Sequence, residues 1–369
     1  MKIKTAGLLR SLVRSGKRMT KLLVAATAPA PKPKTKRKRK PAAASATAAP
    51  RPAVRRKAPA PAAAVAAHIP PSPGKWLASH LTAYGRRMSY WLYIPNNIPE
   101  AALSKGLPLL VMLHGCQQTA TQFAQGTRMN HWAEQMGYAV LYPQQLVSTH
   151  AQRCWKWYDR ATQEGGGDVP MIVGIVNKVL TEYAVDRSRI YIAGISAGAG
   201  MANIVALNHP RLFAAVGMHS GPVFGAGHNT IGALGVMQHG AGPRADLAAR
   251  EVLLRQPQFP GMPAILIQGQ GDSVVRPINQ VQLARQSLLL NGLADAAKIT
   301  EKPQGRGGSR NAHRLHDFYA GRKLLLRVAR IEQLEHAWSG GDASLAYNAK
   351  AGPDASKMML DFFSRHQRI

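Results

Sequence analysis

The residues with the clearest chemical potential are Gly194-Ile195-Ser196-Ala197-Gly198, which directly follow an apolar run at residues 190–193. A serine between glycines, at the junction of a strand and a helix, is typical of a nucleophile elbow, where a sharp turn leaves little room for neighbouring side chains. The apolar run predicts a buried strand, and the Ala- and Met-containing segment 197–208 predicts a helix. We therefore expect Ser196 to be an accessible nucleophile; the alternative is an ordinary Gly-Ser loop.

A serine nucleophile needs a histidine base and a carboxylate that orients it, and in this arrangement the acid and then the histidine follow the serine along the chain. Asp272 comes after the apolar segment 263–268, and His336 comes after the apolar segment 324–331. Both segments have the pattern of buried parallel strands, whose carboxyl ends meet at one edge of a sheet. The spacing predicts a triad of Ser196, Asp272 and His336.

Other acids and histidines compete for these roles. Asp272 could instead cap the helix expected after it. The competing acids are Asp168, Asp186 and Asp246, and the competing histidines are His114, His219, His313 and His316. None of these acids follows a strand as directly downstream of the serine, and the order along the chain favours His336 as the base.

Attack on a carbonyl creates an oxyanion that requires hydrogen-bond donors, normally the amide after the nucleophile and a second amide after an earlier strand. The amide of Ala197 is the first donor. The apolar segment 109–113 predicts the earlier strand, and His114-Gly115-Cys116-Gln117-Gln118 follows it. We expect the second donor to be the amide of Cys116, with that of Gln117 as a further candidate; the alternative is a plain strand-ending turn.

Five separated segments carry a family resemblance, in order along the chain. They are His114-Gly115-Cys116-Gln117-Gln118, Cys154-Trp155-Lys156-Trp157-Tyr158, Gly194-Ile195-Ser196-Ala197-Gly198, His219-Ser220-Gly221 and His336-Ala337-Trp338-Ser339-Gly340-Gly341. Together they resemble the signatures of the polyhydroxybutyrate depolymerase family of serine esterases, over roughly residues 84–367. The resemblance implies an α/β-hydrolase domain that acts on carboxylic esters. Because that family also includes feruloyl and acetyl-xylan esterases, it does not fix the substrate.

The sequence departs from the family pattern at two positions. Glu335 stands where the family usually has glycine before the histidine, and Lys156 replaces an asparagine between two tryptophans. Neither change removes a triad residue, so both bear on the shape and charge of the substrate pocket. The segment 301–322 has the composition of a basic insertion.

The substrate is expected to be a 3-hydroxybutyrate-type ester or oligomer, with feruloyl or acetyl-xylan esters as the alternative. Since the chain ends at Ile369, soon after the histidine loop, soluble esters are expected rather than crystalline polymer. Flat aromatic side chains suit such acyl groups. Trp338, beside His336, is predicted to line the pocket, whereas pocket lining and core packing are equally good interpretations of Trp155 and Trp157. Gln117 is a further predicted substrate contact.

Composition divides the chain into two parts. Residues 1–70 consist largely of Ala, Pro, Lys and Arg, and no Asp or Glu precedes Glu100, so much of the net charge of +30 lies in this segment. A segment of this kind cannot bury enough apolar surface to fold and is predicted to be disordered. Residues 71–369 form the predicted α/β-hydrolase domain, with a mostly parallel sheet and further helices at 131–137 and 169–183.

The basic tail also supports a hypothesis of another class, in which the protein binds a polyanion or a polymer granule and hydrolysis is secondary. No segment approaches the length of a transmembrane helix, and the sequence does not indicate an oligomeric state. An extracellular location follows from the resemblance, with a cytoplasmic, granule-associated protein as the alternative.

The chain has two cysteines, Cys116 and Cys154, in loops that are both expected at the catalytic edge. A disulfide between them is plausible and would favour an oxidising compartment; two buried thiols are the alternative. No His, Cys and carboxylate cluster has metal-ligand spacing, and no phosphate-binding glycine loop is present, so we expect no metal and no cofactor.

Overall fold

The computed structural model describes residues 73–293, 298–305 and 311–368. The basic tail predicted for residues 1–70 lies outside the described residues. Within the described ranges no helix has both the length and the apolar character needed to cross a membrane.

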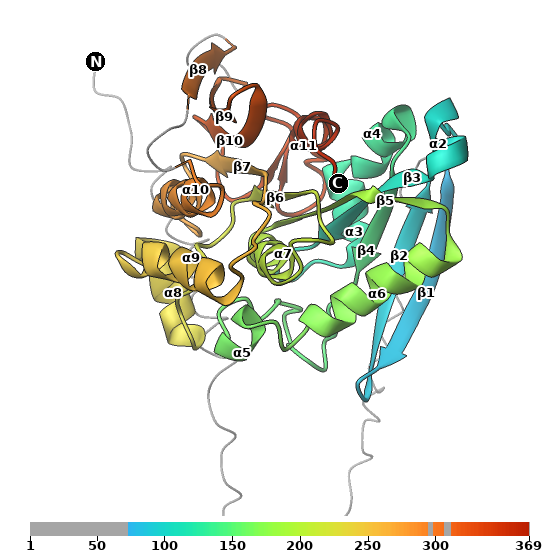
Figure 1. Ribbon diagram of the computed structural model, residues 1–369, viewed down its shortest axis with the longest axis horizontal. Coiled ribbons are helices and arrows are strands. Elements are labelled where there is room, and N and C mark those ends of the chain that lie inside the picture. The colour runs from blue at the N-terminus through green and yellow to red at the C-terminus, as the bar shows by residue number, and fades with distance from the viewer. Residues whose placement is uncertain (1–72, 294–297, 306–310, 369) are drawn as a thin grey trace, which may run out of the picture.

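A central sheet organises the described residues (Figure 1), and its strand order is β1-β2-β4-β3-β5-β6-β7-β10-β9-β8. Its strands are β1 (Lys75–Ala83), β2 (Arg86–Ile94), β3 (Leu107–Leu113), β4 (Ala139–Pro143), β5 (Val185–Ile195), β6 (Ala215–His219), β7 (Ala264–Gly269), β8 (Lys298–Gln304), β9 (His313–Ala320) and β10 (Lys323–Ile331). The strands from β4 through β3, β5, β6 and β7 to β10 are parallel, whereas the outer neighbours pair antiparallel. A short parallel pair, β11 (Trp338–Ser339) and β12 (Asn348–Ala349), follows β10.

Helices lie on both faces of the sheet. They are α2 (Glu100–Lys105), α3 (Ala120–Thr127), α4 (Met129–Met136), α5 (Arg160–Gln163), α6 (Val169–Glu182), α7 (Ala197–Asn208), α8 (Thr230–His239), α9 (Arg244–Arg255), α10 (Ile278–Leu290) and α11 (Ala355–Phe363). Alternate residues of β3 enter different apolar cores: Leu109 and Val111 pack in the core that contains α6, α7 and α9, and Leu110 and Met112 in the core that contains α3, α4 and α11. Burial on both faces explains why β3 is a continuous apolar run rather than an alternating one.

The predicted α/β-hydrolase architecture is confirmed by this mostly parallel, doubly covered sheet. The helix predicted at 197–208 is α7, and those predicted at 131–137 and 169–183 correspond to α4 and α6. The segment 301–322, expected to be a basic insertion, supplies most of the strand pair β8 and β9, which extends the sheet beyond β10. The loops after β3, β5, β6, β7 and β10 all leave the same edge of the sheet, because these strands are parallel.

Candidate active site

Ser196 lies at a sharp turn between β5 and α7, with φ 56° and ψ −123°. A non-glycine residue in this region costs on the order of 1–3 kcal/mol and persists where the surroundings enforce it. A Cβ atom on Gly198 would lie 2.1 Å from the carbonyl oxygen of Leu113, and one on Gly194 would lie 2.5 Å from the backbone of Gly198. Both glycines are therefore required by the close contact between the elbow and the end of β3. Ser196 is more recessed than the sequence suggested, because only 7% of its surface is exposed.

Asp272 lies after β7 with its carboxylate completely buried. One oxygen, Oδ1, accepts hydrogen bonds from the amides of Val274 at 3.0 Å and Val275 at 2.9 Å. The other, Oδ2, accepts from the side-chain amide of Gln268 at 2.9 Å and pairs with Nδ1 of His336 at 2.9 Å. Four donors thus hold this carboxylate in place and aim one oxygen at the histidine.

The contacts of the four acids exclude the alternative roles, namely helix capping by Asp272 and pairing of another acid with His336. Helix α10 begins at Ile278 and has no side-chain cap, so Asp272 does not cap it. The three competing acids are held in ion pairs away from His336. Their partners are Arg86 for Asp168, Arg189 for Asp186 and Arg285 for Asp246.

The loops that carry the acid and the histidine pack against each other through backbone contacts. The amide of Gln270 donates to the carbonyl of Ile331 at 2.8 Å, and the amide of Gly271 donates to the carbonyl of Leu334 at 3.0 Å. A Cβ on Gly269 would lie 2.1 Å from that same Leu334 oxygen. The glycines of the turn therefore allow the approach that brings Asp272 to His336.

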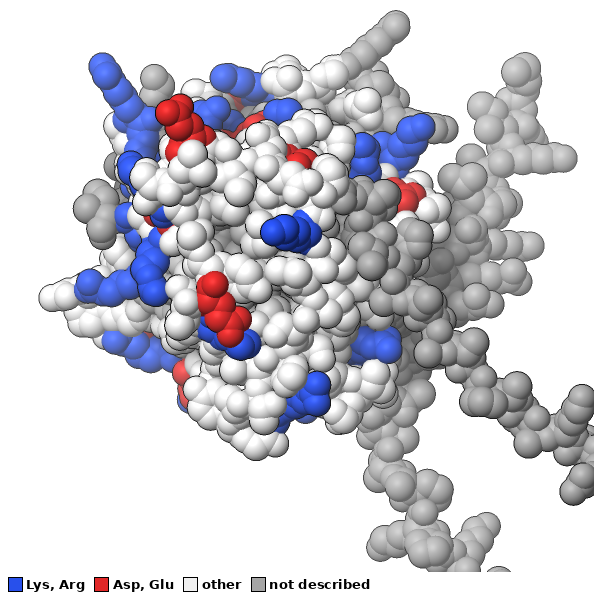
Figure 2. Space-filling model, turned by 90° about the vertical axis from the view of Figure 1, so that its right-hand side faces the viewer, with Lys and Arg blue, Asp and Glu red and all other residues white. Residues whose placement is uncertain are grey.

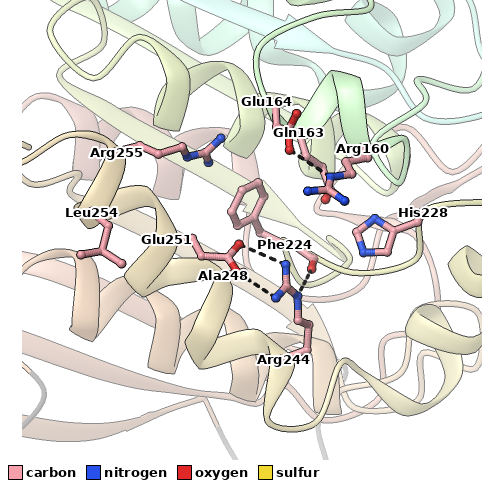
Figure 3. Close-up of a pocket in the computed structure, with 11 residues that line it drawn as sticks. Arg160, Gln163, Glu164, Phe224, His228, Arg244, Ala248, Glu251, Leu254 and Arg255 are labelled. Carbon is pink, nitrogen blue, oxygen red and sulfur yellow. Dashed lines mark hydrogen bonds and ion pairs between the residues drawn. The ribbon is translucent and has the colours of Figure 1, made fainter.

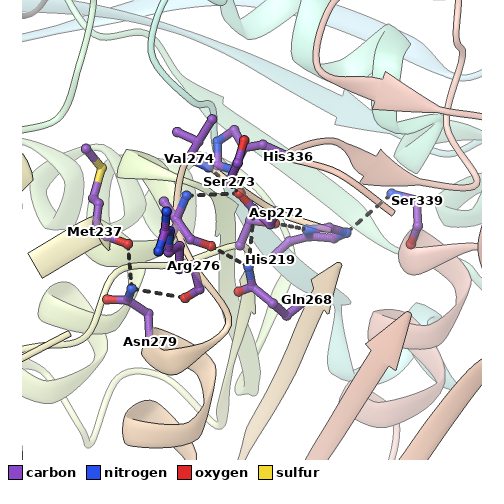
Figure 4. Close-up of polar contacts among 12 residues, drawn as sticks. His219, Met237, Gln268, Asp272, Ser273, Val274, Arg276, Asn279, His336 and Ser339 are labelled. Carbon is purple, nitrogen blue, oxygen red and sulfur yellow. Dashed lines mark hydrogen bonds and ion pairs between the residues drawn. The ribbon is translucent and has the colours of Figure 1, made fainter. Parts of the chain in front are cut away.

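His219, at the end of β6, connects the serine and histidine loops. Its carbonyl accepts the amide of Ser196 at 2.9 Å. Its Nε2 accepts the amide of Ser339 at 3.3 Å (Figure 4). Since Nε2 is an acceptor, Nδ1 carries the proton and donates to Ser220 Oγ at 3.1 Å. Burial, followed by the nearby charge of His336, lowers the pKa of His219 to about 3. His219 is therefore a neutral structural link beside the predicted triad.

His114 has a similar structural role in the predicted oxyanion loop. Its Nε2 accepts the amide of Gln145 at 3.1 Å, so Nδ1 donates to the carbonyl of Gly115 at 2.8 Å. The indole of Trp155 donates to the carbonyl of His114 at 3.0 Å. Complete burial is the main cause that lowers the pKa of His114 to about 4, which keeps the ring neutral. These contacts fix the backbone from which Cys116 projects.

The amides near the serine differ in whether they are free to bind an oxyanion. The backbone amide of Gln117 donates to the carbonyl of Gln152 at 2.6 Å, so this amide is not free to bind an oxyanion. Among the described residues, no protein group accepts a hydrogen bond from the amide of Cys116 or Ala197. Ala197 also begins α7, whose amino-terminal end favours negative charge.

A disulfide and a hydrogen bond stabilise the oxyanion loop. Cys116 is bonded to Cys154, which joins this loop to the segment before Trp155. The side chain of Gln117, predicted to contact substrate, accepts a hydrogen bond from the hydroxyl of Tyr347 at 2.9 Å. The loops after β3 and β10 are therefore linked directly across the site.

The prediction that Trp338 lines the substrate pocket is wrong, because its side chain is completely buried. The indole stacks on His219 with 5.0 Å between ring centroids, meets Phe123 edge-on at 5.6 Å, and donates to Ser356 Oγ at 3.1 Å. For Trp155 and Trp157 the core interpretation holds, since they are 0% and 5% exposed. The residues after β10 turn inward to pair with β12, which carries Trp338 into the core.

Sequence reasoning did not identify Gln268 or Tyr347. Gln268 is the polar residue in an otherwise apolar strand, four positions before Asp272, and a buried amide at that point was a detectable signal. Tyr347 has no comparable signal, because its partner Gln117 is 230 residues away along the chain.

A charged cavity of about 670 Å³ lies apart from these residues, between α5, α9 and the segment after β6 (Figure 3). Its lining includes Arg160, Glu164, Phe224, Arg244, Glu251 and Arg255. Arg244 pairs with Glu251 and Arg160 pairs with Glu164, so most of its charge is internally compensated. None of the residues of the predicted triad lines it. Within the described residues, no group of three or more His, Cys, Asp and Glu side chains is arranged to hold a metal ion.

The family model described as "Esterase PHB depolymerase" matches residues 88–309. These residues contain Ser196 and Asp272 but end before His336.

Curated relatives cover a smaller part of the chain. Acetylxylan esterase A of Emericella nidulans is 33% identical over 39% of this chain and 46% of its own length. Feruloyl esterase B of Neurospora crassa is 34% identical over 39% of this chain and 51% of its own length. The poly(3-hydroxybutyrate) depolymerase of Ralstonia pickettii is 30% identical over 43% of this chain and 35% of its own length. The matches thus span about half or less of these relatives.

Among solved structures, the acetyl xylan esterase from Aspergillus awamori superposes with a TM-score of 0.60. The two chains share 20% identity, and the alignment covers 78% of this chain and 99% of the other. A likeness at this level of identity supports the fold alone.

Proposed function

The chain belongs to the Esterase PHB depolymerase family, and we propose that it is a serine hydrolase of carboxylic esters. The observation that carries the proposal is the hydrogen bond between His336 Nδ1 and the buried Asp272, at the same edge of the sheet as a serine held in an elbow conformation. An aspartate on Nδ1 leaves Nε2 of the imidazole as the base, which is the tautomer that a serine nucleophile requires.

The proposed reaction is a two-step acyl transfer. His336 takes the proton of Ser196 as the serine oxygen attacks the ester carbonyl, and the oxyanion accepts hydrogen bonds from the amides of Cys116 and Ala197. His336 then gives that proton to the departing alcohol. Water, deprotonated by His336, attacks the acyl-serine, and the acid leaves with Ser196 restored.

For the substrate we propose 3-hydroxybutyrate-type esters or short oligomers. Only 7% of Ser196 is exposed, so an acyl group has to enter a recess to reach it. A flexible, isolated polyester molecule or a small ester can enter such a recess, whereas a polyester molecule fixed in a crystalline surface cannot. Acetylated xylan and feruloyl esters are the alternatives, because relatives named for those activities are as similar to this chain as the depolymerase is.

A small substrate panel tests both parts of the proposal. Wild type and Ser196→Ala are assayed on p-nitrophenyl butyrate, 3-hydroxybutyrate oligomers, amorphous polyhydroxybutyrate and methyl ferulate. We expect hydrolysis by the wild type alone, with the highest kcat/KM on the oligomers. A higher kcat/KM on methyl ferulate would replace the polyester assignment, and equal activity of the variant would overturn the serine mechanism.

We also propose that the protein works in an oxidising compartment outside the cytoplasm. The Cys116–Cys154 disulfide supports this, because such bonds rarely persist where thiols are kept reduced. The polyanion contact proposed for the basic tail rests on residues outside the described ranges. On the face shown in Figure 2, Lys and Arg side chains are interspersed with acidic and neutral ones.

A further inference from the structure

A cavity of about 400 Å³ lies at the opposite end of the sheet from the triad. Its lining includes Ala214 before β6, residues 259–261 and Pro263 before β7, residues 290–292 at the end of α10, Lys323 at the start of β10, and the carboxyl-terminal segment 366–368. Because β6, β7 and β10 are parallel, these residues lie at the amino ends of strands whose carboxyl ends lead to the catalytic loops. A strand of six residues such as β7 spans about 20 Å, so the cavity is separate from the proposed active site.

The imidazole ring of a buried histidine at this cavity is unpaired. His366 is 3% exposed, and among the described residues neither Nδ1 nor Nε2 has a hydrogen-bond partner. Its ring packs on Phe362 with 4.5 Å between centroids, which fixes the ring without satisfying its nitrogens. Buried polar atoms are normally paired, since an unpaired one costs about 1–3 kcal/mol. An unpaired ring at the lining of a cavity is a place where a polar ligand would supply the missing partner.

The charge around His366 specifies what kind of ligand would fit. Burial is the main cause that lowers the pKa of His366 to about 3, and the positive charges of Lys323, Arg365 and Arg368 lower it further. Within the described part of the chain, none of these three cations forms an ion pair with a carboxylate. The nearby Asp361 is paired with Lys357 instead.

Arg368 is held in place by neutral backbone groups. Its Nε donates to the carbonyl of Phe213 at 2.7 Å, and its Nη2 donates to the carbonyl of Gly261 at 2.8 Å. These bonds orient the guanidinium at the cavity without neutralising its charge. A partly buried cation that lacks a counter-charge is costly in a protein unless an anion can approach it.

We propose that this cavity binds a small oxyanion, a phosphate or a carboxylate, through Lys323, Arg368 and the ring of His366. The oxyanion supplies an acceptor for the His366 N–H and a negative charge for the two cations, neither of which the described residues provide. Charge-assisted hydrogen bonds of this kind are shorter and stronger than neutral ones. The proposal is independent of the ester chemistry, because no catalytic residue lines the cavity.

The test follows the imidazole signals of the full-length protein by NMR while inorganic phosphate, or in a second series acetate, is added at constant ionic strength. His366 is assigned from the signal missing in His366→Phe, a change that retains the packing on Phe362. We expect a saturable shift of the His366 signal and a rise of its pKa at saturation, since a bound anion favours the charged ring. Saturation by phosphate alone identifies a phosphate-type ligand, and saturation by acetate identifies a carboxylate-type ligand.

Matched variants make the outcome decisive. Lys323→Gln removes a charge from an exposed side chain at the cavity and should weaken binding about tenfold or more. Lys75→Gln, on the opposite edge of the sheet, should leave binding unchanged, and both variants should hydrolyse esters as wild type does. If neither anion saturates the His366 signal, or if the two lysine variants bind alike, the proposal is wrong.

Discussion

The side-chain amide of Gln268 donates to Asp272 Oδ2 at 2.9 Å, the same oxygen that pairs with His336. The same Gln268 amide also donates to the carbonyl of Val275 at 2.7 Å. One side chain at the end of β7 thus holds both the carboxylate and the turn that follows it. Gln268 is a positioning residue for the proposed triad, since it acts through Asp272.

Replacing Gln268 should impair the site through this contact. In Gln268→Leu the carboxylate loses one donor and the Val275 carbonyl loses its partner, so we expect kcat to fall about tenfold with little change in KM, and the free energy of unfolding to fall by about 1–3 kcal/mol. Ester hydrolysis and urea unfolding measure the two effects. Gln270→Leu, at an exposed position of the same turn, is the control; equal losses in both variants would contradict the positioning role.

Gly198, two positions after Ser196, should tolerate no side chain. In Gly198→Ala the new Cβ would lie 2.1 Å from the carbonyl oxygen of Leu113. Relief of this clash has to move the elbow or the oxyanion loop, so we expect kcat/KM to fall about 100-fold or more, as removal of an oxyanion donor does in other hydrolases.

A second glycine provides the matched control for that substitution. Gly235 lies in α8, and no atom lies within 4 Å of a Cβ built on it. Gly235→Ala should keep full activity and raise the free energy of unfolding by about 0.5–1 kcal/mol, because alanine is the better helix residue. Wild-type activity in Gly198→Ala would show that the tight contact does not control the site.

Loss of the disulfide should loosen the oxyanion loop and destabilise the protein. Cys116 and Cys154 enclose a loop with a sequence separation of 38, and removing such a link costs about 2–4 kcal/mol. Chemical denaturation with and without dithiothreitol measures this for the wild type, while the Cys116→Ala, Cys154→Ala double variant should not respond to the reductant. A wild type that is insensitive to complete reduction would contradict the prediction.

Three buried histidines should make stability depend on pH. The pKa values of His114, His219 and His366 are lowered from 6.5 to about 4, 3 and 3, mainly by burial. As the pH falls below 6.5, these histidines bind protons in the unfolded protein but not in the folded one. Burial of the three rings in their neutral form therefore contributes fully to the free energy of unfolding above pH 6.5. This contribution is lost progressively as the pH falls toward 4.

The magnitude can be checked by urea unfolding between pH 7.5 and 4.8. Each histidine contributes at most about 1.4 kcal/mol per pH unit, so the three together contribute at most about 4 kcal/mol per unit. His366→Phe should lower the limiting slope by about one third. A free energy of unfolding that stays constant over this range would contradict the assignment of the three rings as neutral.

The sequence predicted the parts of the molecule that depend on local pattern. The apolar runs that became β3, β5, β7 and β10 were recognisable because strands buried on both faces need unbroken apolar residues. The glycines around Ser196 were recognisable because a close backbone approach excludes side chains.

Tertiary contacts were not predictable in the same way. The orientation of Trp338 depends on the pairing of β11 with β12, and the bond between Tyr347 and Gln117 depends on loops far apart in the sequence. Neither contact leaves a periodic pattern. The recessed position of Ser196 likewise follows from packing around the elbow rather than from its five-residue motif.

The central claim, that Ser196 forms an acyl-enzyme, is tested most directly by intact-mass spectrometry after brief reaction with an excess of p-nitrophenyl butyrate and an acid quench. The account predicts one added butyryl group on the wild type, located by peptide mapping on Ser196, and no adduct on a folded Ser196→Ala variant. An adduct at another residue, or hydrolysis by Ser196→Ala at the wild-type rate, would contradict it.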